Sequence, residues 1–333
     1  MKVTSICAIL LVTVFSLTSC ITSGIGVVGS GPDSGGEAYL AVEAHSGKVL
    51  AGHNPTATRE ISGLTQVATA IVIFDWSTAT GKSLAENAIV PQDVLALGAA
   101  NPMGLQPGDQ LTLRDGLYSM LMGTDAASAQ TLANHVGSEI LQRRGGYGSQ
   151  PVKVFVEEMR QLASALGMTR TRFNSAHGLE LNGSGSTSTA EDIARLGIYA
   201  MRHPGIAFYT NQKSRKIGYS RAGQQLSFQV TNTNSLVGRE GINGLKSVRS
   251  SIAGSCNLIS AERSSLVEKL PGGQSRITPR RMIIVSLGSS NSDGRAYSLL
   301  SPSWQSFDQW MTNRAAGVAE AGLAEQLLTV PNL

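Results

Sequence analysis

The segment Ile61-Ser-Gly-Leu-Thr-Gln-Val-Ala-Thr-Ala-Ile-Val-Ile73 determines how this 333-residue chain packs. From Val67 onward its residues are apolar on nearly every side of a helix, which is typical of a helix buried in the centre of a domain. Ser62 precedes this apolar run, so its hydroxyl is expected to accept a free backbone N–H and to act as the helix N-cap. The segment therefore predicts a central helix around which the other elements pack.

Length and composition are those of an ordinary globular protein with a large core. Charged residues make up 15% of the chain and aromatic residues 5%, and the net charge is +4 with an isoelectric point near 9.0. Lysine and arginine are scattered, and no basic run alternates with aromatic residues, so a nucleic-acid partner is not expected. The sequence holds no CxxC, HExxH or G-x-S-x-G pattern, so zinc hydrolases and nucleophile-elbow esterases lack support. Neither a metal nor a cofactor is expected.

The first twenty residues are expected to form a lipoprotein signal peptide. Lys2 supplies a positive charge, and residues 7–17 form an apolar segment too short to span a bilayer comfortably. The tetrad Leu-Thr-Ser-Cys that ends at Cys20 resembles a bacterial lipobox, in which the signal is removed before a cysteine that carries the lipid. An ordinary signal peptide with an incidental cysteine, or an uncleaved anchor, is the alternative. Residues 21–36 are Gly- and Ser-rich and predict a flexible tether, so the protein is expected to be exported and anchored at a bacterial cell envelope.

Hydrophobic periodicity predicts strands towards both ends of the chain and helices between them. A hairpin is expected from strands over 38–43 and 49–51, and Thr112 and Thr189 are expected to begin helices. Other helices are predicted over 115–122, 126–136, 152–166, 190–201 and 303–310, strands between 208 and 285 and over 281–287, and a helical tail over 313–333. This order predicts an α+β fold in which both chain ends build one antiparallel sheet flanked by helices, with a helical subdomain inserted.

Several short segments, in their order and spacing, resemble the D-alanyl-D-alanine carboxypeptidases, which are low-molecular-weight penicillin-binding proteins. The matching segments are Val42–Leu50, Leu64-Thr65, Leu105–Asp109, Asp125-Ala126, Leu166–Thr169, His177–Leu179, Thr189–Asp192 and Gly244–Lys246. The resemblance implies the serine β-lactamase-like transpeptidase fold over residues 37–312 and an envelope protein that faces peptidoglycan stem peptides. It also implies three catalytic motifs, each of which is altered in this chain.

The first motif of the family, Ser-x-x-Lys, supplies the nucleophile and its base, and it aligns with Gly63 and Gln66. Glycine has no atom that can attack a carbonyl, and the amide of glutamine is not basic. None of the eight lysines in the chain has a serine three residues before it. Ser62 is the neighbouring hydroxyl, but one residue turns a side chain by about 100° around a helix. Ser62 would therefore point away from the pocket unless the start of the helix re-formed.

The second motif, Ser-x-Asn followed by Asp-Ala, aligns with Met122-Gly-Thr124 before Asp125. Counting back from Asp125 puts Met122 in place of the serine and Thr124 in place of the asparagine. A short deletion that keeps the preceding helix in register would instead place Thr124 nearest the serine. In either alignment no asparagine is present to hold a substrate amide. Asp125 is expected to begin a helix rather than act as an acid, and His177 is expected to be structural.

The third motif, Lys-Thr-Gly, is Lys246-Ser247-Val248 in this chain. Lys246 and Ser247 keep the charge and the hydroxyl that would attract a substrate carboxylate, so they are the expected substrate-binding residues. The alternative for Lys246 is a solvated charge at the edge of a strand. Val248 replaces a glycine that lets another backbone approach closely, so its branched side chain is expected to narrow the slot.

Changes at the positions of the nucleophile, the base, the amide holder and the cleft glycine predict a catalytically inactive homologue, because catalytic residues act as a unit. The leading hypothesis is a lipid-anchored envelope protein that uses the old cleft or its surface to bind peptidoglycan stem peptides or an envelope protein. One alternative is an active serine-type D-alanyl-D-alanine carboxypeptidase with the shifted nucleophile Ser62. Another is a purely structural lipoprotein that docks into an assembly through its edges, which exposed apolar patches would favour. A filled cleft would exclude peptidoglycan binding in the cleft and leave the docking hypothesis.

Overall fold

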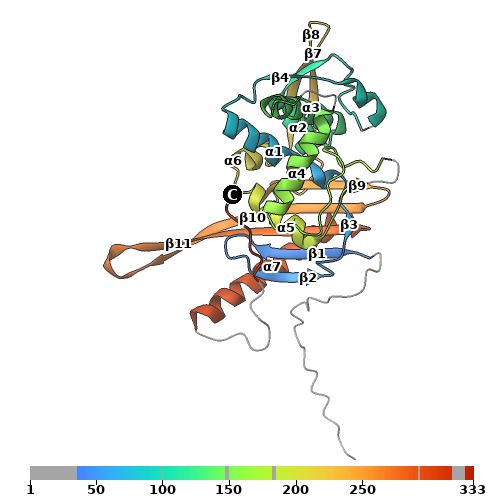
Figure 1. Ribbon diagram of the computed structural model, residues 1–333. Coiled ribbons are helices and arrows are strands. Elements are labelled where there is room, and N and C mark those ends of the chain that lie inside the picture. The colour runs from blue at the N-terminus through green and yellow to red at the C-terminus, as the bar shows by residue number, and fades with distance from the viewer. Residues whose placement is uncertain (1–35, 99, 147–149, 182–184, 292, 317–326) are drawn as a thin grey trace, which may run out of the picture.

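The computed structural model describes residues 36–98, 100–146, 150–181, 185–291, 293–316 and 327–333. It is built on a five-stranded antiparallel sheet with the strand order β2-β1-β11-β10-β9 (Figure 1). The strands are β1 (Ala38–Glu43), β2 (Val49–His53), β9 (Ile242–Ser250), β10 (Gly254–Lys269) and β11 (Ser275–Ser289). Because β1 pairs with β11, a hairpin from the start of the chain joins three strands from its end. The expected sheet built by both chain ends is confirmed.

Helices cover both faces of this sheet (Figure 1). Helix α7 (Gly294–Ala315) packs against β1, β2, β10 and β11 on one face, and α5 (Ala190–Ala200) contacts β1, β10 and β11 from the other. Alternation along β11 explains both contacts, because successive side chains of a strand point to opposite faces. Ile283 and Val285 belong to the core cluster that includes α5, whereas Ile284 belongs to the cluster built around Trp304 of α7. The predicted α+β arrangement is therefore confirmed.

The inserted segment forms a helical lobe above the sheet in the view of Figure 1. Its helices are α1 (Thr65–Thr80), α2 (Leu113–Gly123), α3 (Ala126–Arg143), α4 (Pro151–Ala165) and α6 (Pro204–Thr210). A small sheet adds β4 (Asn87–Ile89), β5 (Gln110–Thr112), β7 (Ser214–Arg221) and β8 (Gln224–Thr231), and β3 (Arg59–Glu60) pairs with β6 (Thr187–Ser188). The 3-10 turns are η1 (Ser62–Leu64), η2 (Gln92–Leu97) and η3 (Pro271–Gly273). Helix α1 contacts all the other helices of the lobe and α5 and is buried from Thr65 to Ile73, which confirms the predicted central helix.

The start of α1 differs from the expectation. Ser62 lies in the 3-10 turn η1 with a φ of +45°, while the N-cap position of α1 is Leu64, and no side-chain cap is made there. The N–H groups that a capping side chain would accept are already bonded within the turn. The Leu64 N–H donates to the Ile61 carbonyl (3.0 Å), and the Thr65 N–H donates to the Ser62 carbonyl. The prediction that Ser62 is an N-cap is therefore wrong.

The N-terminal targeting segment cannot be compared with its prediction. The expected signal peptide over 1–20 and residues 21–35 of the expected tether lie outside the described residues. Within the part of the chain that the structure describes, no helix combines the length and the apolarity needed to cross a bilayer. The lipid anchor at Cys20 stays a prediction.

The C-terminal tail was predicted to be helical over 313–333, and its described residues are helical only up to Ala315. Helix α7 ends at Ala315, residues 317–326 lie outside the described residues, and residues 327–333 are not helical. Leu327 pairs instead with Lys48, and the buried Leu328 donates its N–H to the Gly47 carbonyl (2.7 Å). Leu328 is buried against the domain from a non-helical backbone, whereas Leu327 and Leu333 are exposed. The helical prediction is therefore wrong over 327–333.

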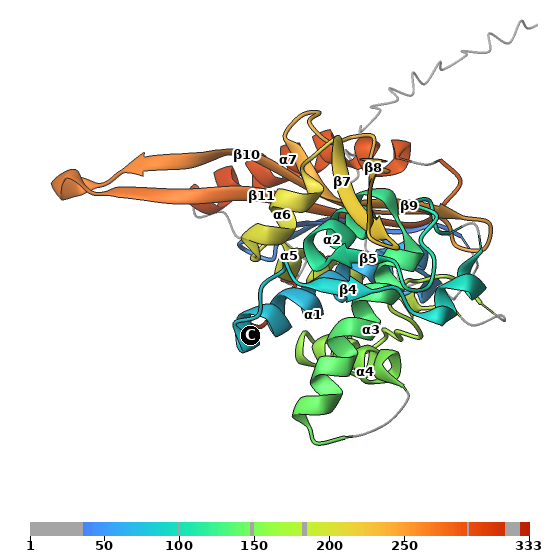
Figure 2. The ribbon, with the colours of Figure 1, turned by 90° about the horizontal axis from the view of Figure 1, so that it is seen from above.

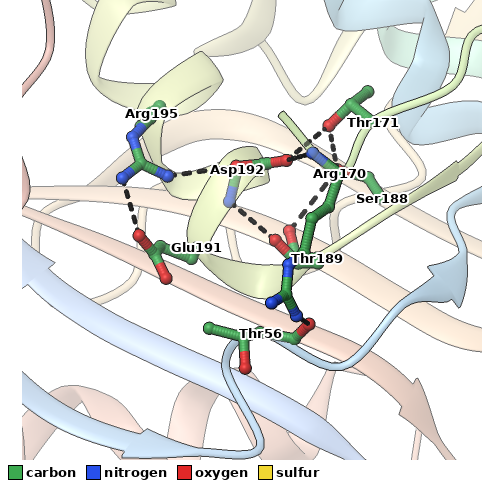
Figure 3. A network of polar contacts seen from close by, with 8 residues as sticks. All are labelled: Thr56, Arg170, Thr171, Ser188, Thr189, Glu191, Asp192 and Arg195. Carbon is green, nitrogen blue, oxygen red and sulfur yellow. Dashed lines mark hydrogen bonds and ion pairs between the residues drawn. The ribbon is translucent and has the colours of Figure 1, made fainter. Parts of the chain in front are cut away.

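A buried polar cluster fixes the chain between α4 and α5 (Figure 3). The Asp192 carboxylate accepts hydrogen bonds from the Arg170 N–H (3.0 Å), the Thr171 hydroxyl (2.9 Å) and the Arg195 guanidinium (3.0 Å). The Arg170 guanidinium reaches across to the Thr56 carbonyl (2.7 Å). A buried carboxylate with three donors is well compensated. The cluster thereby anchors the loop over 170–179, whose other end packs on η1.

Candidate active site

The positions of the three family motifs lie together around Gly63. Gly63 belongs to η1, which contacts β9, and it packs against Thr124 in the turn between α2 and α3. A Cβ added to Gly63 would lie 2.7 Å from Thr124 Cγ2, 3.1 Å from Val248 Cγ1 and 3.7 Å from Lys246 Cε. The first of these distances is shorter than any that real side chains tolerate, since packed carbon atoms sit about 3.5–4.0 Å apart. The fold therefore brings together the positions that the sequence aligned, and it fills the space that the side chain of a nucleophile needs.

Lys246 is turned into the protein and is fully buried. Its Nζ donates hydrogen bonds to the carbonyls of Met120 (2.9 Å) and Leu121 (3.1 Å) and to Thr124 Oγ1 (3.0 Å). An ammonium has three N–H groups, so none is left for a substrate carboxylate. Burial lowers the pKa of Lys246 to about 7, and the charge of Asp125 opposes that shift only in part. The alternative of a solvated strand-edge charge is wrong, and the expected substrate-binding role of Lys246 gains no support.

Thr124 ties the end of α2 to β9. It occupies the C-cap of α2 in the left-handed region, with a φ of +58°, and its Oγ1 lies 3.2 Å from Thr233 Oγ1. The Thr233 hydroxyl donates in turn to the Ser247 carbonyl (2.7 Å), and the Thr233 N–H donates to the Met122 carbonyl (2.8 Å). Met122 is fully buried in the core. Because the hydroxyl beside Lys246 belongs to Thr124, the geometry favours the alignment with a short deletion.

Asp125 is a helix cap, as expected, and not an exposed acid. Its fully buried carboxylate accepts hydrogen bonds from the Ser119 hydroxyl (2.7 Å), the Ser128 hydroxyl (2.8 Å) and the Ser128 N–H (3.1 Å) at the start of α3. Burial raises the pKa of Asp125, although these donors work against the shift. The carboxylate holds the α2–α3 turn, on which the position of Thr124 depends.

Gln66 and His177 pack together on the other side of Gly63. The Gln66 Nε2 donates to the His177 carbonyl (3.1 Å), and the Gln66 Oε1 is buried without a hydrogen-bond partner among the described residues. His177 Nδ1 accepts the Leu179 N–H (3.0 Å), and burial lowers the pKa of His177 to about 4. The imidazole is therefore neutral at pH 7 and supports the loop, which fits the structural role expected for it.

Ser62 and Ser247 are the two hydroxyls that remain as candidates. Ser62 is 7% exposed, and its hydroxyl makes no hydrogen bond within the described residues. The carbonyl of Ser62 lies under Gly178, where an added Cβ would come within 2.1 Å of its oxygen. The Ser247 Oγ is buried and likewise has no partner in the described part of the chain. Neither hydroxyl is therefore paired with a base.

Among the described residues around Gly63, neither candidate nucleophile is paired with a base. An acyl-transfer site needs a nucleophile with a base in contact with it, and neither the Ser62 nor the Ser247 hydroxyl is hydrogen-bonded to a base among these residues. In the described ranges, no three His, Cys, Asp or Glu side chains are grouped so as to hold a metal ion. The surroundings of Gly63 instead resemble a packed core, in which the buried Lys246 caps the C-terminal carbonyls of α2.

The family is decided by a profile described as D-alanyl-D-alanine carboxypeptidase, which matches residues 27–267 and thus more than half of the chain. The chain belongs to the D-alanyl-D-alanine carboxypeptidase family. Solved structures agree on its fold. The Streptomyces K15 DD-transpeptidase matches with a TM-score of 0.65 and 22% identity over 82% of this chain and 96% of that chain. Penicillin-binding protein D2 of Listeria monocytogenes, in its cefotaxime-bound form, matches with a TM-score of 0.59 and 22% identity over 84% and 96%. The transpeptidase fold implied by the resemblance is confirmed.

Relatives within the carboxypeptidase family cover this chain to different extents. The D-alanyl-D-alanine endopeptidase of Escherichia coli K12 is 26% identical over 236 residues, which are 71% of this chain and 69% of that protein. The carboxypeptidase DacC of the same strain is 30% identical over 200 residues, which are 58% of this chain and 46% of that protein. The chain therefore spans less than two thirds of the length of some curated relatives that it matches.

Two contacts at the edge of this family site were missed by the sequence analysis. Thr233 connects Thr124 to β9, and the Ser250 hydroxyl of β9 donates to a Glu180 carboxylate oxygen (3.1 Å) in the loop after His177. The polar run Thr231-Asn-Thr-Asn234 was the only local signal for the first contact. For the second the sequence holds no local signal, because Glu180 and Ser250 are joined only by the fold.

Proposed function

We propose that this chain is a catalytically inactive member of the D-alanyl-D-alanine carboxypeptidase family that acts by non-covalent binding at a bacterial envelope. The observation that carries the proposal is the environment of Lys246, whose three N–H groups all go to Met120, Leu121 and Thr124. Gly63 offers no nucleophile, and Gln66 offers no base. Lys246 is the remaining charged residue of the motifs, and it binds the carbonyl groups at the end of α2.

Activity through Ser62 would require a base within hydrogen-bond reach of its hydroxyl. No lysine, histidine or carboxylate among the described residues makes that contact. Burial does lower the pKa of Lys246 to about 7, which suits a base, but its Nζ is held by the α2 carbonyls. Recruiting it would require the α2–α3 turn to open and Ser62 to leave η1. We therefore place inactivity ahead of the shifted-nucleophile alternative.

Peptidoglycan stem peptides are the ligand class that we propose first. Relatives in the family are named for D-alanyl-D-alanine, the end of such a peptide. The Ser247 Oγ on β9 has no partner in the described residues, and such atoms usually bind water or a ligand. Thr124 and Val248 fill the space next to Gly63. The peptide would therefore bind at the surface of the cleft between η1 and β9 and would not enter it. Docking to an envelope protein is the second candidate, and the filled pocket favours it.

The location is part of the same proposal. The small-residue tetrad ending at Cys20 supports removal of the signal before that cysteine and lipid attachment to it. The Gly- and Ser-rich residues that follow are long enough to let the domain reach its ligand while it stays at the membrane. An anchored position beside the cell wall suits a protein that binds stem peptides or another envelope protein.

The proposal is tested with a peptide ending in D-alanyl-D-alanine and the protein from Gly36 onward, with free D-alanine as the readout. We expect no release above buffer from the native protein or from a Ser62→Ala variant, while an active family member run alongside releases D-alanine. Release that disappears in Ser62→Ala would overturn the proposal and identify Ser62 as the nucleophile. A titration of the same peptide followed by NMR then separates the candidates, because shifts confined to β9 and η1 support stem-peptide binding and unchanged spectra favour docking.

A further inference from the structure

Strands β10 and β11 extend beyond the sheet as a long hairpin, which we call the β-arm and define as residues 262–281. Figures 1 and 2 show it projecting past the rest of the molecule. The ladder between β9 and β10 ends at Ala261 opposite Ile242, and the ladder between β1 and β11 ends at Glu43 opposite Met282. Just beyond these pairs the Glu262 N–H still donates to the Gly241 carbonyl (2.9 Å), and the Arg281 carbonyl accepts the Ala44 N–H (2.8 Å). From Arg263 to Arg280 the outer edges of the β-arm have no partner strand in the described residues.

The distal part of the β-arm exposes apolar side chains. Val267 and Ile277 face each other across the two strands and are 63% and 64% exposed, and Leu266 is 38% exposed. A two-stranded hairpin alone is marginally stable in water, and an exposed strand edge is a template for pairing with another chain. A structure that keeps such an arm, with its apolar residues outside, is suited to an interface.

The two edges of the β-arm differ in their ability to pair. The edge of β11 carries Pro279, which has no N–H to donate, beside the like charges of Arg276 and Arg280. The edge of β10 has no proline, and its residues from Arg263 to Lys269 are all exposed. Pairing therefore has to occur through β10.

We propose that the β10 edge of the β-arm pairs with the same edge of a second copy of this chain. The segment Glu262-Arg-Ser-Ser-Leu-Val-Glu-Lys269 is complementary to itself when two copies run antiparallel. The register between β10 and β11 shifts between Arg263 and Leu266, and this bulge changes which residues point outward along the β10 edge. With a two-fold axis at the bulge, between Ser265 and Leu266, Glu262 lies opposite the second copy's Lys269. In the same register Arg263 lies opposite the second copy's Glu268, and symmetry repeats both pairs. Opposite charges directly across strands are stabilising, and like charges are not.

The contacts that the β-arm makes within its own chain have to be kept or exchanged when it pairs. Glu262 Oε2 binds the Arg281 guanidinium (2.7 Å) and accepts a hydrogen bond from the Asn243 amide (3.1 Å), and its other oxygen can face the second copy's Lys269. The Arg263 guanidinium lies over the Trp304 ring, 4.6 Å from its centroid. Glu268 is bound to Arg276 (3.2 Å) and Arg263 lies 3.5 Å from Asp308, and all four side chains are at least 40% exposed. Exposed ion pairs contribute little, so exchanging them costs little. The Ser264 carbonyl accepts a hydrogen bond from Arg280 Nε (2.7 Å). On pairing, this carbonyl would accept a backbone N–H of the second copy instead. The paired segment is short, so the dimer is expected to be weak and dependent on concentration.

Sedimentation of the protein from Gly36 onward, which holds every described residue, tests this inference. We expect a monomer–dimer equilibrium at micromolar to millimolar concentration. Glu268→Lys puts like charges opposite Arg263 twice, and Arg263→Glu puts like charges opposite Glu268 twice. Each variant alone is expected to raise the dissociation constant of the dimer by about tenfold or more. An equimolar mixture of the two variants is expected to restore association, because every facing pair is then opposite in charge.

Each outcome decides the proposal. Native protein that stays monomeric throughout this range overturns it and assigns the β-arm to a different partner. A dimer that either variant leaves unchanged places the interface elsewhere. Loss of the dimer in both variants without recovery in the mixture overturns the antiparallel register. The proposal does not depend on catalytic inactivity or on stem-peptide binding, since the β-arm lies outside the site around Gly63.

Discussion

Replacing Lys246 with methionine is expected to abolish a gain in stability that the native protein shows as the pH rises from about 7 to about 10. Burial lowers the pKa of Lys246 to about 7, whereas the unfolded chain keeps this lysine protonated up to its ordinary pKa of 10.5. Between these values the unfolded state binds more protons than the folded state, so the free energy of unfolding increases with pH. Three pH units correspond to about 4 kcal/mol. Urea denaturation of both proteins from pH 6 to pH 10 measures the difference.

The comparison between the two proteins removes the contributions of other groups, because these titrate in both. A Lys153→Met variant is the matched control, since Lys153 is an exposed lysine on α4, away from the core. Its curve is expected to run parallel to that of the native protein. If the free energy of unfolding of Lys246→Met changed with pH in parallel with that of the native protein, the buried position of Lys246 would be contradicted.

A Gly178→Ala variant is expected to lose about 3 kcal/mol or more of the free energy of unfolding. Gly178 has a φ of +78°, and an added Cβ would lie 2.1 Å from the Ser62 carbonyl oxygen and 3.0 Å from Thr65 Cβ. The left-handed backbone alone costs a non-glycine residue about 1–2 kcal/mol, and a clash with backbone atoms that cannot move freely adds to that cost. Denaturant unfolding followed by circular dichroism gives the value.

Gly167→Ala separates the two causes. Gly167 has a similar φ of +71°, but an added Cβ there would meet no atom within 4 Å. This variant is expected to lose only the backbone cost, about 1–2 kcal/mol. Equal losses in the two variants would show that the loop carrying His177 does not pack tightly against η1, and would contradict the packed arrangement around Gly63.

Local rules predicted most of the framework. Thr112 and Thr189 begin α2 and α5 as expected, since each side chain accepts the N–H of the aspartate three residues later. Strand alternation and the apolar run after Ser62 likewise predicted the hairpin and the central helix, because burial imposes these periods on the sequence. Those features depend on residues that are neighbours in the chain.

The features that were missed depend on contacts between distant segments. The Lys246 ammonium binds carbonyls of α2 that lie more than a hundred positions earlier in the sequence. The neighbours of Lys246 in the sequence therefore could not show whether it is a buried cap or a solvated charge. Ser62 fails as a cap because the Ile61 carbonyl and the η1 turn already use the nearby amides. The tail residue Leu328 is apolar at helical spacing, yet it pairs with Gly47, which only the fold brings close.

Covalent trapping by a penicillin examines catalytic inactivity at the chemical step itself. The protein from Gly36 onward is incubated with excess benzylpenicillin, and its intact mass is measured beside a Ser62→Ala variant and an active member of the family. With Gly63 and Gln66 in place of nucleophile and base, we predict an unchanged mass for both forms of this protein and an added acyl group on the active relative. A mass increase of one penicillin on the native protein that is absent from Ser62→Ala would contradict the account.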